Sequence, residues 1–345
     1  MTTGAAFGIA PPPIVDVAGL TVDFETGART VRAVHGVDLR LDRGEALGLV
    51  GESGSGKSVT WMAVMRLLGP RARVGGDILL DGTRTNDLPE AAMEKLRGRR
   101  MAMIFQDATS ALNPVHRIGR QLVEAVRLHR GLDGSSARAE AKRLLDRVRI
   151  ANAAQRLDEY PHQMSGGMNQ RVMIAMALAG EPDLLIADEP TTALDATIQA
   201  QILDLLREIR RDGMAMVLIS HDLGVVAENC DRIAVMYAGR IVEQAPSDAL
   251  FEDPRHPYTR GLMAAVPDLD GPRRPLVAIP GTVPEPWNLP TGCAFAPRCP
   301  EAGPDCAVAV PPLARLPASS GAGRRTACVR VAGAAARSQS RELVS

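Results

Sequence analysis

The sequence lacks an excess of charge of either sign, and it lacks any long hydrophobic run. Its 40 Lys and Arg residues balance 40 Asp and Glu residues, which gives a formal net charge of +0 at pH 7. No overall field therefore draws the whole molecule to nucleic acid or to a membrane surface. No apolar run approaches the roughly 20 residues that a transmembrane helix needs. We expect a soluble, cytoplasmic protein that reaches a membrane only through a partner.

Aromatic residues are scarce, at 3% of the 345 residues, although the hydrophobic content is ordinary for a globular protein. A chain of this length can hold a large α/β domain and a smaller appendage. Residues 1–13 have neither the basic start nor the apolar core of a secretory signal, and they end in three prolines. We expect them to form a disordered lead-in.

Short apolar runs alternate with stretches of helical spacing along most of the chain. Runs typical of strands lie at 14–24, 31–41, 46–50, 75–82, 101–105, 184–189 and 215–220, and a hairpin is expected at 233–243. Helical spacing is found at 59–68, 118–149 and 193–210. This alternation predicts an α/β nucleotide-binding core over 14–265, and we interpret the charged helical stretch at about 113–180 as an insertion into it.

A glycine-rich segment at 51–58, Gly-Glu-Ser-Gly-Ser-Gly-Lys-Ser, follows an apolar run and opens a helix. Its glycines let the loop bend so that backbone N–H groups point at phosphate oxygens. Lys57 supplies a compact positive charge, and Ser58 can ligate Mg²⁺. We predict a triphosphate site made by Gly51, Ser53, Gly54, Ser55, Gly56, Lys57 and Ser58. The alternative, a chance glycine-rich turn, is disfavoured by the carboxylates downstream.

Those carboxylates, Asp188 and Glu189, end a predicted apolar strand. We predict that Asp188 holds Mg²⁺, directly or through water, and that Glu189 polarises the attacking water as a general base. Gln106 and His221 end two other predicted strands, at the edge where α/β sheets bind ligands. Gln106 is expected to contact Mg²⁺ or the water, and His221 the γ-phosphate. The alternative is that each is an ordinary polar surface residue.

With the segment Ser165-Gly166-Gly167-Met168, these motifs resemble the ATP-binding cassette (ABC) family, in the family's order. Segment 51–58 resembles the Walker A motif, 184–189 the Walker B motif, and Ser165–Gly167 the signature motif. The resemblance gives Gln106 the place of the Q-loop glutamine and His221 that of the switch histidine.

Two further positions follow from the same resemblance. Leu194-Asp195 resembles the loop that touches the opposing subunit, and Phe24 is the candidate for the aromatic ring that stacks on adenine. The resemblance implies a P-loop NTPase fold: an ABC nucleotide-binding domain with an inserted helical subdomain.

Segments 160–168, 256–260 and 292–300 resemble the ATPase subunits of bacterial oligopeptide/dipeptide importers. Asn169 departs from the arginine often seen there, at a variable position. The resemblance implies a small Cys-containing C-terminal extension and a head-to-tail pair of cassettes. ATP held by Lys57 of one cassette is then closed over by Ser165, Gly166 and Gly167 of the other.

The resemblance also implies partners and a location. The partners are a second ABC ATPase subunit, identical or paralogous, two integral membrane permease subunits and an extracytoplasmic substrate-binding protein. The location is the cytoplasmic face of the cell membrane, where this chain is peripheral. Ala108 to Gln121 resembles the surface that receives the permeases' coupling helices; a plain solvated loop is the alternative.

Di- or oligopeptides are the expected cargo, although similar ATPases serve nickel, glutathione and opine importers. Two other classes of protein are alternatives. A soluble, non-transport ABC ATPase usually carries two cassettes or a long coiled-coil insertion, and the sequence has neither. A catalytically dead cassette is disfavoured by Lys57, Glu189, Ser165 and His221.

Residues 266–330 are rich in proline and hold Cys293, Cys299, Cys306 and Cys328, spaced C-x5-C-x6-C-x21-C. Structural zinc sites usually use tighter pairs, and disulfides are disfavoured in the cytosol. Spacing alone leaves zinc, an iron–sulfur cluster and free thiols open. Some importer ATPases of the resembling group carry a [4Fe-4S] cluster here, so the resemblance favours that cluster.

The fifth cysteine, Cys230, stands apart in the sequence. We predict a partly buried structural residue there rather than a ligand. Residues 331–345 are expected to form a flexible tail.

Overall fold

A computed structural model describes residues 12–27, 29–107, 111–192, 194–211, 213–265, 278–317 and 323–331. The expected lead-in at 1–13 and tail at 331–345 therefore lie almost wholly outside the described residues. Parts of the proline-rich region, 266–277 and 318–322, lie outside them as well. In the described part of the chain, no helix is both long and apolar enough to span a bilayer.

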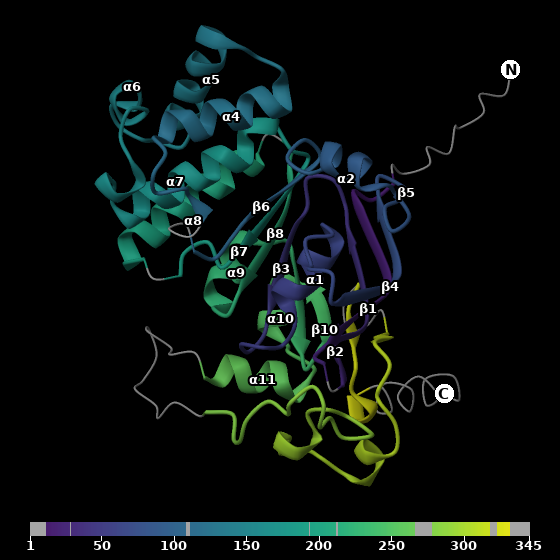
Figure 1. Cartoon of the computed structure of the whole chain (residues 1–345). Helices are drawn as coiled ribbons and strands as arrows, with labels where there is room; N and C mark the ends of the chain where they lie inside the picture. Colours follow the sequence, from purple (N-terminus) through teal and green to yellow (C-terminus); the bar gives the residue numbers. More distant parts are fainter. Residues whose placement is uncertain are drawn as a thin grey trace, which may run out of the picture.

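A central sheet of eight strands runs through the molecule in the order β11-β12-β10-β9-β3-β8-β7-β6 (Figure 1). Its strands are β3 (Ala46–Val50), β6 (Met101–Ile104), β7 (Leu184–Asp188), β8 (Ala215–Ser220), β9 (Arg232–Tyr237), β10 (Arg240–Pro246), β11 (Ala314–Arg315) and β12 (Arg325–Thr326). The pairs among β3, β6, β7, β8 and β9 are parallel, and those of β10 with β9 and β12 are antiparallel. The parallel strands are continuous apolar runs because both of their faces are covered.

A second, antiparallel sheet has the order β2-β1-β4-β5. It is built from β1 (Val15–Glu25), β2 (Thr30–Leu41), β4 (Ala72–Leu80) and β5 (Thr83–Arg84). Helix α1 (Lys57–Val64) packs between the two sheets, since its fully buried Trp61 shares one hydrophobic cluster with Leu20 of β1 and Leu49 of β3. This packing fixes the helix whose N-terminus begins at Lys57.

The chain between β6 and β7 is helical, as predicted. It forms α4 (Ile118–Arg130), α5 (Gly134–Arg147), α6 (Ala153–Arg156), η1 (Pro161–Gln163), α7 (Gly166–Ala177) and η2 (Leu178–Gly180). These helices gather at one end of the molecule, away from the antiparallel sheet (Figure 1). The expected single stretch at 118–149 is two helices, because Gly131 adopts a left-handed φ of 68° and ends α4.

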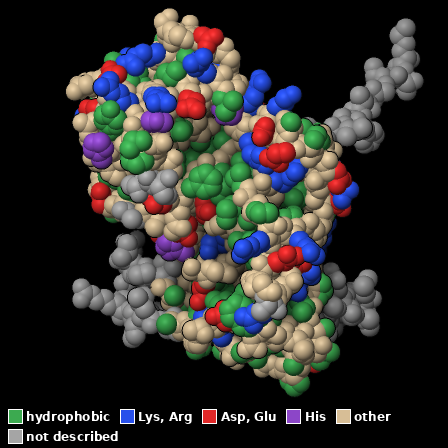
Figure 2. All heavy atoms as spheres, in the orientation of Figure 1, with side chains coloured by type: hydrophobic (Ala, Val, Ile, Leu, Met, Phe, Trp, Pro, Cys, Tyr) green, Lys and Arg blue, Asp and Glu red, His purple; other side chains and the backbone are tan. Residues whose placement is uncertain are grey.

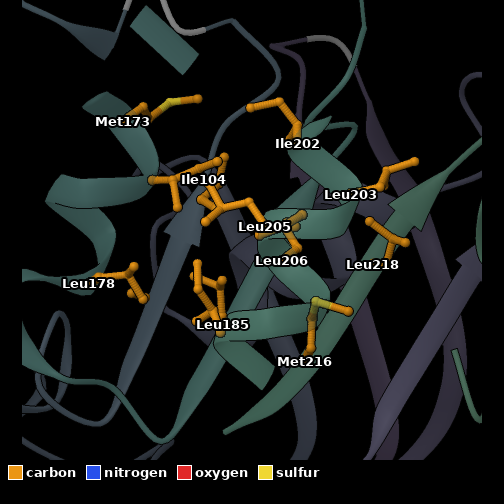
Figure 3. Close-up of a cluster of buried hydrophobic side chains, with 14 of the residues drawn as sticks. Ile104, Met173, Leu178, Leu185, Ile202, Leu203, Leu205, Leu206, Met216 and Leu218 are labelled. Carbon is orange, nitrogen blue, oxygen red and sulfur yellow. The ribbon is translucent and has the colours of Figure 1, made fainter. Parts of the chain in front are cut away.

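Helix α8 (Ala196–Arg210) joins this layer to the central sheet. Figure 3 shows its Leu205 and Leu206 between Met173 of α7 and the strand residues Leu185 and Met216, and Ile202 of α8 belongs to the same cluster. The amphipathic pattern of α8 accounts for this, since its buried residues lie three or four apart along one face. The remaining helices are α2 (Glu90–Leu96), α9 (Leu223–Asn229), α10 (Ser247–Glu252), α11 (Pro257–Ala264), η3 (Ala296–Arg298) and η4 (Pro304–Ala307).

The proline-rich C-terminal region is attached to the cassette by strand pairing and by the packing of aromatic side chains. Strand β12 pairs with β10 at the edge of the central sheet, where Thr326 faces Glu243. Phe295 is buried against Tyr237 of β9 and Tyr258 of α11, with both ring centroids 5.3 Å away. The composition predicted a segment with no sizeable core of its own, and the region instead uses the cassette's core.

Candidate active site

The glycine-rich loop connects the carboxyl end of β3 to the N-terminus of α1. A Cβ atom on Gly51 would lie 2.1 Å from the carbonyl oxygen of Met236. Gly56 has a left-handed φ of 102°, and a Cβ there would lie 2.9 Å from Met236 Cε. Only glycine fits at both positions, so the backbone can bend tightly and turn its N–H groups into the loop.

Lys57 is buried inside this loop. Its Nζ donates hydrogen bonds to the carbonyl oxygens of Gly51, at 2.7 Å, and Glu52, at 3.0 Å. Burial lowers the pKa of Lys57, and the carboxylates of Glu189 and Asp188 act in the opposite direction. The nearby Ser55 Oγ is buried without a hydrogen-bond partner in the described part of the chain. A buried cation and an unpaired hydroxyl are the groups that a phosphate would satisfy.

Ser58 and Asp188 form the second part of the site. Ser58 Oγ donates to Asp188 Oδ1 at 2.9 Å, which joins the start of α1 to the end of β7. Burial raises the pKa of Asp188, while the hydrogen bond from Ser58 lowers it. A hydroxyl and a carboxylate beside a phosphate loop are oxygen donors of the kind Mg²⁺ prefers. The residues present therefore fit Mg²⁺.

Two other predicted residues, Gln106 and His221, lie next to the carboxylate of Glu189. Its Oε2 accepts from Gln106 Nε2 at 3.1 Å and from Thr192 Oγ1 at 2.9 Å, and His221 Nδ1 lies 3.2 Å away. Gln106, Glu189 and His221 follow β6, β7 and β8, so adjacent parallel strands deliver all three to one edge. Glu189 has a positive φ of 45°, an uncommon backbone conformation that clusters at functional sites.

Thr192 was missed as a site residue in the sequence. It lies three residues after Glu189 and is close to it only because the chain turns there, with Thr192 N–H donating to the Glu189 carbonyl. The pattern Pro190-Thr191-Thr192 carries no signal that would single out the third residue.

The signature segment lies on other elements. Ser165 caps α7, with its Oγ accepting from Met168 N–H at 3.3 Å. A Cβ on Gly167 would lie 2.6 Å from Ile198 Cγ2, so α7 approaches α8 closely there. Among the described residues, no hydrogen bond links Ser165, Gly166 or Gly167 to the loop at 51–58. Within this chain, therefore, no hydrogen bond among the described residues joins the signature segment to the phosphate loop. That the two meet across a dimer stays a prediction.

The predicted adenine-stacking residue and the predicted docking segment have known places in the fold, and their roles stay predictions. Phe24 lies half-buried in β1, paired with Val31 and Ala72. The predicted docking segment begins at 108–110, outside the described residues, but its remainder is ordered by Gln121, whose Nε2 donates to the carbonyls of Asn113 and His116.

On the face drawn in Figure 2, the surface is hollowed between the part that carries α4 to α7 and the rest of the chain. Side chains of both charges border this hollow.

The prediction of a [4Fe-4S] cluster on Cys293, Cys299, Cys306 and Cys328 is wrong. In the parts of the chain that the structure describes, no group of three or more His, Cys, Asp or Glu side chains could hold a metal ion. Burial raises the pKa of Cys293 and of Cys299, which favours the thiol over the thiolate that a metal needs. The backbone organises this segment instead, for example through Cys293 N–H donating to the Cys306 carbonyl at 2.8 Å.

Cys230 is buried, more completely than the partial burial predicted from the sequence. It lies against Gly48 of β3, where an added Cβ would come within 3.2 Å of its Sγ. Asn169 is buried as well, and its Nδ2 donates to the Pro161 carbonyl at 3.0 Å.

Family models match two parts of this sequence. The model described as "ABC transporter" matches residues 34–192, and the one described as "Oligopeptide/dipeptide transporter, C-terminal region" matches residues 242–306. The second match contains Tyr258, Phe295 and three of the four C-terminal cysteines.

Curated relatives extend the similarity to most of the chain. A Brucella abortus protein provisionally named a peptide import ATP-binding protein is 54% identical over 296 residues, which is 85% of this chain and 89% of the relative. The oligopeptide transport ATP-binding protein OppD of Haemophilus influenzae is 49% identical over 298 residues, which is 86% of this chain and 92% of the relative.

Solved structures agree on the fold. The dimeric ATP-binding cassette MJ0796, in a post-hydrolysis state bound to ADP and Pi, matches 68% of this chain and 98% of its own with a TM-score of 0.61 and 29% identity. The cbiO1 protein of Clostridium perfringens, part of the ABC transporter complex cbiONQ, matches 70% of this chain and 92% of its own with a TM-score of 0.59 and 27% identity.

Proposed function

The chain belongs to the ABC transporter ATPase family, and from this premise we propose that it is the ATP-hydrolysing subunit of an importer for di- and oligopeptides. The observation that carries the ATPase part is the meeting of Gln106, Thr192 and His221 on one carboxylate oxygen of Glu189, beside the Ser58–Asp188 pair. The peptide part is supported by the names of the relatives and by the C-terminal family model.

In this proposal the glycine-rich loop and Lys57 bind the triphosphate. Ser58 and Asp188 would hold Mg²⁺, which neutralises charge on phosphate oxygens when it is bound. Glu189 accepts a proton from the attacking water as the water oxygen bonds to the γ-phosphorus and ADP leaves. Hydrogen bonds from Gln106 and Thr192, with His221 beside them, orient the Glu189 carboxylate for this step.

A second cassette completes the site. Ser165 and the following N–H groups open α7, and the N-terminus of a helix is a ready anion-binding site. Supplied from the opposing ATPase subunit, it adds charge stabilisation around the γ-phosphate. Closure of the pair then drives two permease subunits between access states at the cytoplasmic face of the membrane, and Ala108 to Gln121 is the surface proposed to touch them.

Reconstitution tests the function as a whole. The chain is assembled in vesicles with its second ATPase subunit, the two permease subunits and the substrate-binding protein, and ATP hydrolysis is measured. A peptide-loaded binding protein should raise the hydrolysis rate several-fold and drive peptide uptake. Stimulation by nickel or glutathione but not by peptides would reassign the cargo, and hydrolysis that is indifferent to the membrane subunits would contradict a transport role.

A further inference from the structure

The C-terminal region contacts the phosphate loop through an ion pair between a buried arginine and a partly exposed glutamate. Arg298 of η3 donates from Nη1 to Glu52 Oε2 at 2.7 Å and from Nη2 to Glu52 Oε1 at 3.0 Å. Glu52 is the second residue of the glycine-rich loop, 246 positions away in the chain. A two-pronged pair of this kind is both strong and directional.

Arg298 is held in place by more than its carboxylate partner. Its side chain is only 5% exposed, and its Nε donates to the Pro280 carbonyl at 2.8 Å. Its Nη1 also lies 3.3 Å from Tyr237 Oη, and its guanidinium carbon lies 5.8 Å from the Tyr237 ring centroid. The hydrogen bonds to Glu52 raise the pKa of Arg298 above its ordinary value. The guanidinium is therefore a fixed positive charge in a preformed position.

Helix α11 holds the same loop residue from a second side. The backbone N–H of Glu52 donates to Tyr258 Oη at 2.9 Å, and Tyr258 packs on Phe295 of the C-terminal region. The Glu52 carbonyl in turn accepts from Lys57 Nζ at 3.0 Å. Glu52 is thus shared between the groups that bind phosphate and the groups that anchor the C-terminal region.

A glutamate in this loop carries an electrostatic cost for a site that binds a triphosphate. Like charges repel, and the repulsion is larger near a partly dry site than in bulk water. Arg298 offsets that negative charge and holds the carboxylate on the side of the loop that faces the C-terminal region. Without Arg298, the free carboxylate would repel the phosphates and could also draw Lys57 away from them.

We propose that Arg298 is a positioning residue for ATP binding, because it neutralises and orients Glu52 of the phosphate loop. This rests on the proposed function, since it assumes that the loop binds ATP. It gives the C-terminal region, which no motif connects to nucleotide chemistry, a direct part in the affinity for MgATP.

The test compares four forms of the full-length chain by calorimetric titration with MgATP: unmodified, Arg298→Gln, Glu52→Gln and the double variant. Arg298→Gln should weaken binding about fivefold to tenfold because it frees the Glu52 charge. Glu52→Gln alone, and the double variant, should bind within about twofold of the unmodified chain. A double variant as weak as Arg298→Gln would overturn the proposal, because the loss would then be independent of the Glu52 charge.

Arg260→Gln is the matched control, since Arg260 of α11 pairs with Glu301 of the same C-terminal region at a half-exposed site. It should leave MgATP affinity unchanged. If Arg298→Gln does not fold, Arg298→Lys keeps the charge but loses the two-pronged hydrogen bond, and adding Glu52→Gln to it should bring MgATP affinity to within about twofold of the unmodified chain; a loss that persists in that double variant would overturn the proposal. An unmodified chain that binds no MgATP would instead remove the proposed function, so the two failures are distinguishable.

Discussion

Ser58 and Asp188 lie 130 residues apart in the chain and are joined by a hydrogen bond of 2.9 Å from Ser58 Oγ to Asp188 Oδ1. The bond connects the first turn of α1 to the last residue of β7. Burial raises the pKa of Asp188, and the hydrogen bond from Ser58 offsets only part of that rise. A buried acid of this kind reduces stability and is retained at sites that need its charge.

Asp188→Asn should therefore stabilise the nucleotide-free chain while removing its activity. The raised pKa means that folded Asp188 binds a proton more readily than unfolded Asp188, so stability falls as pH rises through the folded-state pKa. Asparagine has no charge to bury, and we expect its melting temperature to be higher by a few degrees at pH 7.5. Differential scanning calorimetry of both chains without nucleotide measures this.

The advantage of Asp188→Asn should shrink as the pH is lowered through the raised folded-state pKa of Asp188, because Asp188 of the unmodified chain then takes up its proton. Mg²⁺-dependent ATP hydrolysis should be lost at every pH. A variant that melts lower than the unmodified chain at pH 7.5 would show that the hydrogen bond from Ser58 and the attraction of Lys57 outweigh the burial of Asp188.

Glu189→Gln should leave MgATP binding intact and slow hydrolysis by at least about 100-fold. The amide keeps the shape of the side chain and its contacts but cannot accept the proton of the attacking water. Single-turnover hydrolysis and nucleotide binding are measured in the assembled transporter. Glu208→Gln, on an exposed carboxylate of α8 paired with Arg149, is the control and should behave as the unmodified chain. Unmodified turnover in Glu189→Gln would remove Glu189 from the mechanism.

The sequence predicted best those elements whose structure follows from a single feature of the residue pattern. The buried parallel strands are short apolar runs, and the strand ends that carry Gln106, Glu189 and His221 were found from that pattern alone. The hairpin of β9 and β10 was also confirmed, with its turn at Ala238-Gly239. What the pattern could not give is contact between distant segments.

The C-terminal region is the clearest case of that limit. Two-residue strands such as β11 and β12 have no periodicity; β12 forms on the open edge of β10, and β11 forms on β12. The pair of Arg298 with Glu52 has no local signal at all, since neither residue differs from an ordinary surface charge in the sequence. The four cysteines are a strong local signal that gave a wrong prediction. They suggested a metal, whereas burial and backbone hydrogen bonds hold the segment.

Ser165→Asp should separate ATP binding from hydrolysis. Aspartate caps a helix about as well as serine, so α7 should keep its N-terminus and the chain its stability. Its negative charge, however, faces the triphosphate of the opposing subunit in the proposed dimer. We expect hydrolysis by the assembled transporter to fall by at least about 100-fold, while MgATP still binds to the isolated chain with unmodified affinity.

Ser165→Asn supplies the matched control, because it keeps the cap without the charge. It should retain clearly more activity than Ser165→Asp. If Ser165→Asp weakened MgATP binding by the isolated chain, the signature segment would act on its own chain's nucleotide, and the head-to-tail arrangement would be contradicted.

The packing of helix α11 against the phosphate loop and the C-terminal region should weaken in mild acid because of His256. Its Nδ1 accepts from Tyr258 N–H at 3.1 Å at the start of α11, so the ring must be neutral, and burial lowers its pKa to about 4. A depressed folded-state pKa means that stability is lost as pH falls below the ordinary value of 6.5. Between pH 7.5 and pH 5 this one residue should cost up to about 2 kcal/mol of unfolding free energy.

His256→Asn should remove that part of the acid sensitivity, since asparagine caps helices well and does not titrate. Urea unfolding of the full-length chain at pH 7.5 and pH 5 measures the loss in each form, and His162→Asn, at an exposed histidine, is the control. The loss should be smaller in His256→Asn than in the other two chains. Because Tyr258 on the same helix holds Glu52 of the phosphate loop, MgATP affinity of the unmodified chain should fall over the same pH interval. Equal acid sensitivity in all three chains would show that His256 is not the group responsible.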